Sequence, residues 1–237
     1  MTTDLFKRAR ARSTAVCPTN KRLVNWDSDT EVEEEPNDPM NHIFFYPNRP
    51  TLIPPDPSNP MDPKPDYING LEASGIYIAE KKYNGDNCYY YPNTKQFWNR
   101  HKAVHRYKPT PEVQAELDKL PRDAHYNLEL VNYRTALTKN LLVVHCVMVW
   151  KGQPLLGKTW GDSRKILERV IPSTNQYVIL SPVWQTGFWD LFNQADGKEI
   201  EGIILKNPKG RLVFSTTSDV EVPWMKKIRK PCKKYRF

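Results

Sequence analysis

The chain has 237 residues, of which 39% are apolar, and it carries a formal net charge of +8. This size and low apolar content predict one folded domain with an irregular segment rather than two domains. The longest apolar run, Leu141–Trp150, is far shorter than the roughly 20 residues that cross a bilayer, so we expect no membrane segment. The four cysteines lie far apart without a C-x-x-C pair, which does not indicate a zinc site. The basic N-terminus lacks the apolar stretch of a secretion signal, and together these features favour a cytoplasmic location.

Residues 1–69 are predicted to be a largely irregular segment and linker, followed by a folded domain at 70–237. Eleven of the 21 prolines lie before residue 70, together with a block of seven acidic side chains between Asp27 and Asp38. Such a composition resists packing into a core. The prolines from Pro47 to Pro65 are too closely spaced for a helix or an inner strand, so this stretch is expected to be extended coil.

From residue 70 onward, short apolar runs alternate with turn residues and a few helical stretches, which predicts an α+β fold. Residues 76–82 alternate as a strand does and place Lys82 at the strand end. Asn84-Gly85 supplies a turn, and a second strand resumes at 88–91. Farther on, Leu141–Trp150 is predicted to be a buried strand.

Two helices and a hairpin complete the prediction. The first helix begins at Thr110 with proline next, and its apolar stripe is Val113, Leu117 and Leu120. Asp162 is expected to cap the second helix. A type I turn at 207–210 separates the apolar runs 203–205 and 212–214, which predicts that the two runs pair as a hairpin.

The C-terminal stretch 223–237 is strongly basic and contains no acidic residue. Its cations are Lys226, Lys227, Arg229, Lys230, Lys233, Lys234 and Arg236. This density indicates a polyanionic partner, although a solvated basic tail has the same composition.

Several short motifs carry the candidate chemistry when they are taken in order. They are Lys82-Tyr83-Asn84-Gly85, Glu129 in an apolar strand, Glu201-Gly202-Ile203-Ile204-Leu205-Lys206, and a lysine cluster after Trp224. Each alone is weak: the first is equally a hairpin turn with a surface lysine, and the carboxylates are equally partners of neighbouring lysines. Their order over residues 72–230 resembles the covalent nucleotidyltransferase superfamily, which includes DNA ligases, RNA ligases and mRNA capping enzymes.

The resemblance implies a role for each matching residue. Lys82, with glycine three residues later, is the implied nucleophile, and Glu201 is the implied metal ligand. The implied nucleotide-binding residues, including Lys82 itself, are Glu80, Lys82, Asn87, Arg100, Glu129, Lys206, Lys226, Lys227 and Arg229. The implied fold is an antiparallel-sheet, ATP-grasp-like nucleotidyltransferase domain with a long proline- and acid-rich N-terminal segment.

These residue types suit covalent nucleotide transfer. A free lysine is mostly protonated at pH 7, so a nucleophilic lysine needs neighbouring positive charge, for which lysines 81, 206, 226 and 227 are candidates. The same cations would neutralise the transferred phosphate. The carboxylate of Glu201 offers Mg²⁺ a hard oxygen ligand, and Mn²⁺ is an alternative. Gly85 and Gly202 are expected to allow close approach of a nucleotide to the backbone.

The implied activity is ATP-dependent strand ligation through a lysyl-AMP intermediate. The sequence after Gly85 lacks the arginine of DNA ligases and capping enzymes and ends in Asn87, as in RNA ligases that seal nicks in duplex RNA. Few residues follow the lysine cluster, so no oligonucleotide-binding barrel is expected. RNA is therefore the favoured substrate, for a monomeric enzyme in the cytoplasm, or in the host cytoplasm if the source is viral.

Three alternatives stay open at this stage. A DNA ligase and an mRNA capping guanylyltransferase use the same motifs, and a non-catalytic nucleic-acid-binding module would need only the scaffold and the basic cluster. Base recognition is also open, because Val143 and Val144 stand where the family has an aromatic residue. His145, which interrupts the apolar strand, is interpreted as a core histidine.

Overall fold

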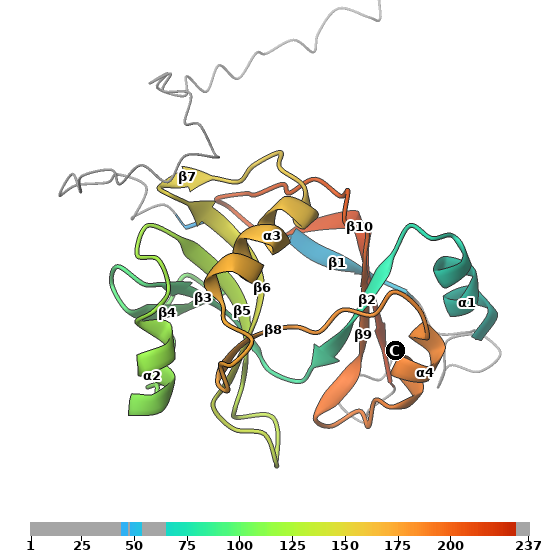
Figure 1. Cartoon of the computed structure of the whole chain (residues 1–237), viewed down its shortest axis with the longest axis horizontal. Coiled ribbons are helices and arrows are strands. Elements are labelled where there is room, and N and C mark those ends of the chain that lie inside the picture. Colours follow the sequence, from blue (N-terminus) through green and yellow to red (C-terminus); the bar gives the residue numbers. More distant parts are fainter. Residues whose placement is uncertain (1–43, 47, 54–64, 231–237) are drawn as a thin grey trace, which may run out of the picture. The chain divides into compact units, whose positions relative to one another are not determined.

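The computed structural model describes residues 44–46, 48–53 and 65–230, all of which belong to one compact unit, Asn37–Phe237. Ten strands and four helices are present in this described part, arranged in two sheets (Figure 1). The predicted α+β class is confirmed, since all but two of the strand pairings are antiparallel. No helix in these ranges is long and apolar enough to cross a membrane.

The first sheet has four strands. Their order is β1 (Asn48–Leu52), β10 (Val220–Arg229), β9 (Ile200–Lys206) and β2 (Ile78–Tyr83). Helices α1 (Pro65–Ala73) and α4 (Phe188–Asn193) lie beside β2 and β9 (Figure 1). They bury Ile68, Phe188 and Phe192 against Ala79, Ile203, Leu205 and Ile228 of the sheet. One face of this sheet is thus an apolar core, which leaves the other face for the site.

The second sheet has β6 at its centre. Its strands are β4 (Gln96–Asn99), β3 (Asp86–Tyr91), β5 (His125–Val131), β6 (Leu141–Trp150) and β7 (Gln153–Pro154), with β8 (Val178–Leu180) also paired to β6. Helix α3 (Trp160–Val170) packs against β6, and α2 (Pro111–Leu117) contacts β8. The buried strand predicted at Leu141–Trp150 is confirmed residue for residue.

Both predicted helices are present, with one change at a cap. Thr110 caps α2 by accepting from the backbone N–H of Val113, and Val113 and Leu117 are buried as expected. The cap of α3 is Thr159 and not Asp162. Asp162 lies three residues later and accepts from the Thr159 backbone N–H, which completes a capping box.

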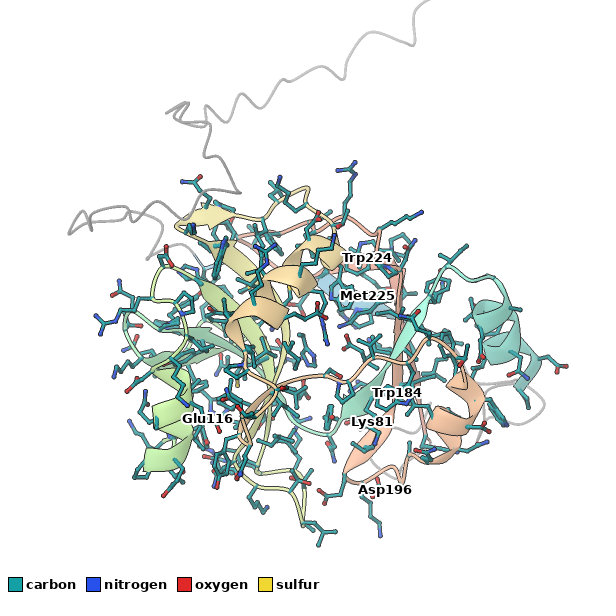
Figure 2. The ribbon with its side chains drawn as sticks, in the orientation of Figure 1. Lys81, Glu116, Trp184, Asp196, Trp224 and Met225 are labelled. Carbon is teal, nitrogen blue, oxygen red and sulfur yellow. The ribbon has the colours of Figure 1, made fainter. Side chains whose placement is uncertain are left out.

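The predicted hairpin of 203–205 with 212–214 is wrong. The turn forms, with the N–H of Gly210 donating to Asn207, but β9 pairs with β10 instead. Leu212 is drawn into the core of the second sheet, and its N–H donates to Lys158 before α3. A Cβ on Gly210 would lie 2.2 Å from the indole of Trp224, so the turn is fixed by packing under this side chain, which Figure 2 labels on β10.

Two regular elements precede or span residue 70, in the stretch predicted to be largely irregular. β1 pairs in parallel with β10 at the sheet edge, where the missing N–H of Pro50 is tolerated. α1 begins at Pro65. Residues 54–64, also predicted to be extended, and the acidic block lie outside the described residues. The domain boundary at residue 70 stays a prediction.

Candidate active site

Strand β2 presents its two candidate residues to a cavity between the sheets. Glu80 and Lys82 are two residues apart and share a face. Ala79 packs into the α1–α4 core on the other face, and Lys81, which alternation places beside Ala79, also borders the cavity. Figure 2 shows Lys81 beside Trp184, and its Nζ lies 5.6 Å from the ring centroid. The Lys82 side chain is only 15% exposed. Lys82 is therefore not a surface lysine. The turn after it is not a hairpin either, because β2 and β3 belong to different sheets.

Glu201 reaches this cavity through a β-bulge. Lys82 pairs with Gly202 and Tyr83 with Ile200, so Glu201 is the extra residue that has no partner on β2. Strict alternation would place Glu201 on the core face with Ile203. The bulge turns it toward Lys82 instead.

The backbone at Gly202 explains why glycine follows Glu201. Its φ is +154°, and a Cβ there would lie 2.0 Å from the carbonyl oxygen of Ile228. A Cβ on Gly85 would lie 2.6 Å from the side chain of Glu129. Both glycines are thus required by contacts within the protein, and the close approach of a nucleotide at these positions remains a prediction.

One carboxylate oxygen of Glu201 contacts two cations. Oε2 is 2.5 Å from Nζ of Lys82 and 3.3 Å from Nε of Arg229. All three side chains are mostly buried, with exposures of 8%, 15% and 21%. The predicted nucleophile and the predicted metal ligand are therefore in direct contact, and the local charge remains positive.

Alternation along β10 separates the predicted lysine cluster. Lys227 and Arg229 line the cavity, whereas Lys226 lies between them and points with Ile228 toward the opposite face. Lys226 does not line the cavity in this structure, and its nucleotide-binding role remains a prediction. Burial, reinforced by the charges of Arg49 and Arg229, lowers the pKa of Lys227 to about 8.

Glu80 and Lys206 form a buried ion pair at one side of the cavity. The two side chains are 2% and 4% exposed, and Lys206 Nζ is 2.8 Å from Glu80 Oε2. The same ammonium lies 4.8 Å from the ring centroid of Trp160. Glu80 Oε1 is buried, and no hydrogen-bond partner for it exists in the described part of the chain. Lys206 is therefore neutralised and is not the like-charge neighbour of Lys82 that the sequence suggested.

Glu129 links the two sheets at the turn after Lys82. Its Oε1 accepts from the N–H of Gly85 at 3.0 Å, and its Oε2 lies 3.8 Å from Nε2 of His145. Burial by itself would raise the pKa of Glu129, but His145, the charge of Lys82 and the Gly85 N–H together hold this pKa below its usual value. Glu129 is consequently an anion that holds the turn after Lys82 in place.

The remaining predicted residues lie at the rim of the cavity. Asn87 is exposed, and its Oδ1 accepts from Nδ2 of Asn127 at 3.1 Å. Arg100 is exposed, with its Nε 3.4 Å from Nε2 of His101. Neither contacts Lys82 in this structure, and their nucleotide-binding roles remain predictions.

Several residues of the cavity wall were not assigned to the site from the sequence. Asn127, His145 and Trp160 are among them. His145 did give a signal, because it interrupts the apolar strand β6, but it was assigned to the core. Trp160 gave no signal in the sequence. It is the first residue of α3, and its Nε1 donates to the backbone oxygen of His145 at 3.3 Å.

The cavity has a volume of about 880 Å³ and is bounded by both sheets. This volume lies within the range of small-molecule sites, roughly 300–1,000 Å³. Within the described residues no three His, Cys, Asp or Glu side chains cluster as a metal site. A magnesium ion held by one carboxylate together with substrate phosphates and water needs no such cluster, so Glu201 fits that mode of binding.

Comparisons with known proteins found resemblances only among solved structures. No protein-family model and no curated protein matches the chain. A Lig E DNA ligase shares 13% identity, with a TM-score of 0.48 over 65% of this chain and 62% of its own. For the ligase domain of M. tuberculosis LigD the identity is 16% and the TM-score 0.49, over 65% of this chain and 53% of that one. The ATP-dependent DNA ligase of bacteriophage T7, solved with ATP, has 13% identity and a TM-score of 0.44. The match covers 77% of this chain and 68% of that chain.

The chain spans less than two thirds of the length of the first two of these structures. All three are DNA ligases, which belong to the superfamily that the sequence motifs resemble. Identities of this size and TM-scores below 0.5 carry no weight for activity. The function is therefore argued from the side chains of the cavity.

Proposed function

We propose that the chain is an ATP-dependent polynucleotide ligase that works through a covalent Lys82–AMP intermediate. The observation that carries the proposal is the contact of Lys82 Nζ with Glu201 Oε2 at 2.5 Å, which forms where a bulge in β9 turns this carboxylate toward the cavity. Binding of a nucleic acid alone would not require a buried lysine in this position.

Charges around Lys82 suit a triphosphate. Lys82, Lys227 and Arg229 face the cavity, whereas Glu201 and Glu129 supply the opposing charge and the Glu80–Lys206 pair is neutral overall. A bound polyphosphate would complete this balance, and phosphoryl transfer depends mostly on such positioning and electrostatics.

The proposed reaction has three balanced steps. The amine of Lys82 attacks the α-phosphorus of ATP, a P–N bond forms, pyrophosphate leaves, and the amine proton is released. An oxygen of a 5′-phosphate then attacks the same phosphorus, the P–N bond breaks, and the lysine recovers a proton. Finally a 3′-hydroxyl attacks the activated 5′-phosphate, a phosphodiester bond forms, the anhydride bond to AMP breaks, and AMP and the hydroxyl proton leave, which seals the strand.

Glu201 is proposed as the protein ligand of Mg²⁺, with Mn²⁺ as an alternative. When bound, the ion would supply charge neutralisation to the phosphate oxygens. The same carboxylate contacts Lys82 through Oε2. We therefore propose that a cation at Glu201 would weaken this contact and help to release the Lys82 side chain toward substrate.

ATP is proposed as the nucleotide on the resemblance of the motifs to those of ATP-dependent ligases. Glu80 is the proposed contact for the base, because its Oε1 is a buried acceptor in the cavity wall that has no donor among the described residues. Adenine offers its N6 amino group and guanine its N1–H and N2 amino group as donors, so the choice of base is decided by comparing ATP with GTP. Lys206 holds the other oxygen of Glu80 and so fixes its orientation.

RNA is proposed as the strand, on the sequence Gly85-Asp86-Asn87 and its likeness to RNA ligases. The test is sealing of nicked duplexes in which the 5′-phosphate strand and the 3′-hydroxyl strand are each RNA or DNA, with ATP or GTP and Mg²⁺. We expect ATP-dependent sealing that is fastest with RNA strands. Label transfer from GTP would indicate a capping enzyme, and strong salt-sensitive binding without nucleotide transfer would indicate a binding module.

A further inference from the structure

A second group of polar side chains lines the same cavity, around Asp86 at the start of β3. It is drawn from the segment after β4 and from the loop after β5. Its members are Arg100, His101, His105, Arg106, Arg134 and the neighbouring Tyr133. Apart from Arg100, which the resemblance assigns to the nucleotide, none of them has a role in the reaction at Lys82 described above, so they are available for a different ligand.

Asp86 holds two of these side chains in place. Its Oδ1 lies 2.8 Å from Nε of Arg134, and its Oδ2 lies 3.9 Å from Nε2 of His105. Burial lowers the pKa of His105, opposed by the charge of Asp86, so this imidazole is neutral at pH 7. The positive charge therefore resides on Arg100, Arg106 and Arg134, which exceed the single carboxylate.

Arg106 is placed by an aromatic ring. Its guanidinium carbon lies 4.6 Å from the centroid of the Tyr133 ring, and Tyr133 is 44% exposed. The His105 ring is 6.1 Å from the same ring. An exposed aromatic ring beside arginines is the arrangement with which proteins hold the end of a nucleic-acid strand, by stacking a base next to a bound phosphate.

The group is close to the nucleophile along the chain. Asp86 is four residues after Lys82, so their Cα atoms are at most about 14 Å apart. The acceptor in the proposed second step is a phosphate monoester, which carries close to two negative charges at neutral pH, whereas the attacking 3′-hydroxyl is uncharged. A cationic subsite is thus needed for the 5′-phosphate end and not for the 3′ end.

We propose that Arg106 and Arg134 form the binding site for the 5′-phosphate of the acceptor strand, with Tyr133 as the platform for its terminal nucleotide. The inference rests on the proposed ligase function, and it assigns the substrate end to one wall of the cavity. Asp86 acts as a positioning residue, because it holds Arg134 and does not itself contact the phosphate.

Binding of two nicked duplexes tests this assignment directly. Both carry a fluorophore and differ only in a 5′-phosphate or a 5′-hydroxyl at the nick, and fluorescence anisotropy is measured in EDTA without ATP to prevent reaction. We expect the full chain to prefer the phosphate. Charge-assisted hydrogen bonds of this kind contribute enough for Arg106→Gln or Arg134→Gln to reduce that preference by about tenfold or more.

Arg169→Gln is the matched control, since it removes an exposed arginine of α3 that does not line the cavity. It should leave the preference intact. Equal weakening of both duplexes by Arg106→Gln would mean a general backbone contact and would overturn the assignment. A wild-type chain that binds both nicks equally would overturn it as well. Tyr133→Leu provides a second variant, expected to weaken binding of both ends while the phosphate preference is retained.

Labelling of the same proteins with α-labelled ATP, without any strand, separates this inference from the proposed function. Absence of label on the wild type would contradict the ligase but would leave the phosphate preference measurable. If Arg106→Gln loses self-labelling in parallel with strand binding, the arginine belongs to the ATP site and the acceptor assignment fails.

Discussion

Lys82 Nζ and Glu201 Oε2 lie 2.5 Å apart, although 119 residues separate them in sequence. The contact joins the end of β2 to the bulge of β9, and Arg229 of β10 approaches the same oxygen to 3.3 Å. Three neighbouring strands thus converge on one carboxylate. If Glu201 holds the metal as proposed, metal binding and the position of Lys82 should be linked in experiments on this site.

Glu201→Gln should abolish most of the nucleotide transfer. An amide keeps the shape of the carboxylate but lacks the charge that holds Mg²⁺ and Lys82. The initial rate of self-labelling with ATP is expected to fall by about a hundredfold or more, and the Mg²⁺ concentration for half-maximal rate should rise. Glu168→Gln, an exposed residue of α3, is the control. An unchanged rate and Mg²⁺ dependence in Glu201→Gln would remove this residue from the metal site.

Gly202→Ala should destabilise the fold, because its Cβ would meet the carbonyl of Ile228 at a backbone φ of +154°. We expect the free energy of unfolding in urea to fall by about 2–4 kcal/mol. Gly70→Ala is the opposite case: it lies inside α1 with nothing within 4 Å of its Cβ, and should raise stability by about 0.5–1 kcal/mol. Equal effects of the two changes would show that the bulge geometry is incorrect.

Replacing one partner of the buried Glu80–Lys206 pair should lower the free energy of unfolding more than replacing both partners. Lys206→Met leaves a carboxylate that is 2% exposed without its cation, and is expected to lower the free energy of unfolding by about 3–5 kcal/mol. Adding Glu80→Gln should recover much of that loss. A double-mutant cycle in urea measures the coupling, and additive losses would contradict the pairing.

The affinity for ATP should depend on pH through Lys227. Because its pKa is lowered to about 8, the side chain is charged and attracts phosphate below pH 8, and it loses that charge as the pH rises through 8. Titration calorimetry from pH 7 to 9.5 should therefore show weaker binding at the upper end, by up to about tenfold per pH unit. Lys227→Arg stays charged and should flatten the profile. The same fall in Lys227→Arg would assign the effect elsewhere.

Regular strands made most of the site predictable from the sequence. Period-two alternation put Glu80 and Lys82 on one face, and the apolar run around Glu129 marked its strand. Glu201 lies on the cavity face against that alternation, and the glycine after it was the available signal, since glycine inside a strand often marks a bulge. Lys226 could not be separated from Lys227 while the basic stretch was interpreted as a cluster without a strand.

Other parts depend on tertiary pairing that local patterns do not encode. Strand β1 was not predicted because of the closely spaced prolines around it. Pro50 is tolerated in this strand because β1 lies at a sheet edge. The predicted hairpin does not form, because β9 is paired with β10 on one side and β2 on the other, and Leu212 packs into the core of the second sheet. The group around Asp86 could not be predicted from sequence spacing. Its members Arg106, Tyr133 and Arg134 are brought together because β3 pairs with both β4 and β5.

The most direct test of the account is the identity of the residue that carries AMP. Each protein is incubated with ATP and Mg²⁺, and the adduct is located by peptide mass spectrometry in the wild type, Lys82→Ala and Lys81→Ala. Lys81 is the matched control, since its side chain lies over Trp184 on the opposite face of the same strand. The account predicts AMP on Lys82 in the wild type and in Lys81→Ala, and none in Lys82→Ala. An adduct that persists in Lys82→Ala, or that maps to Lys81, would contradict it.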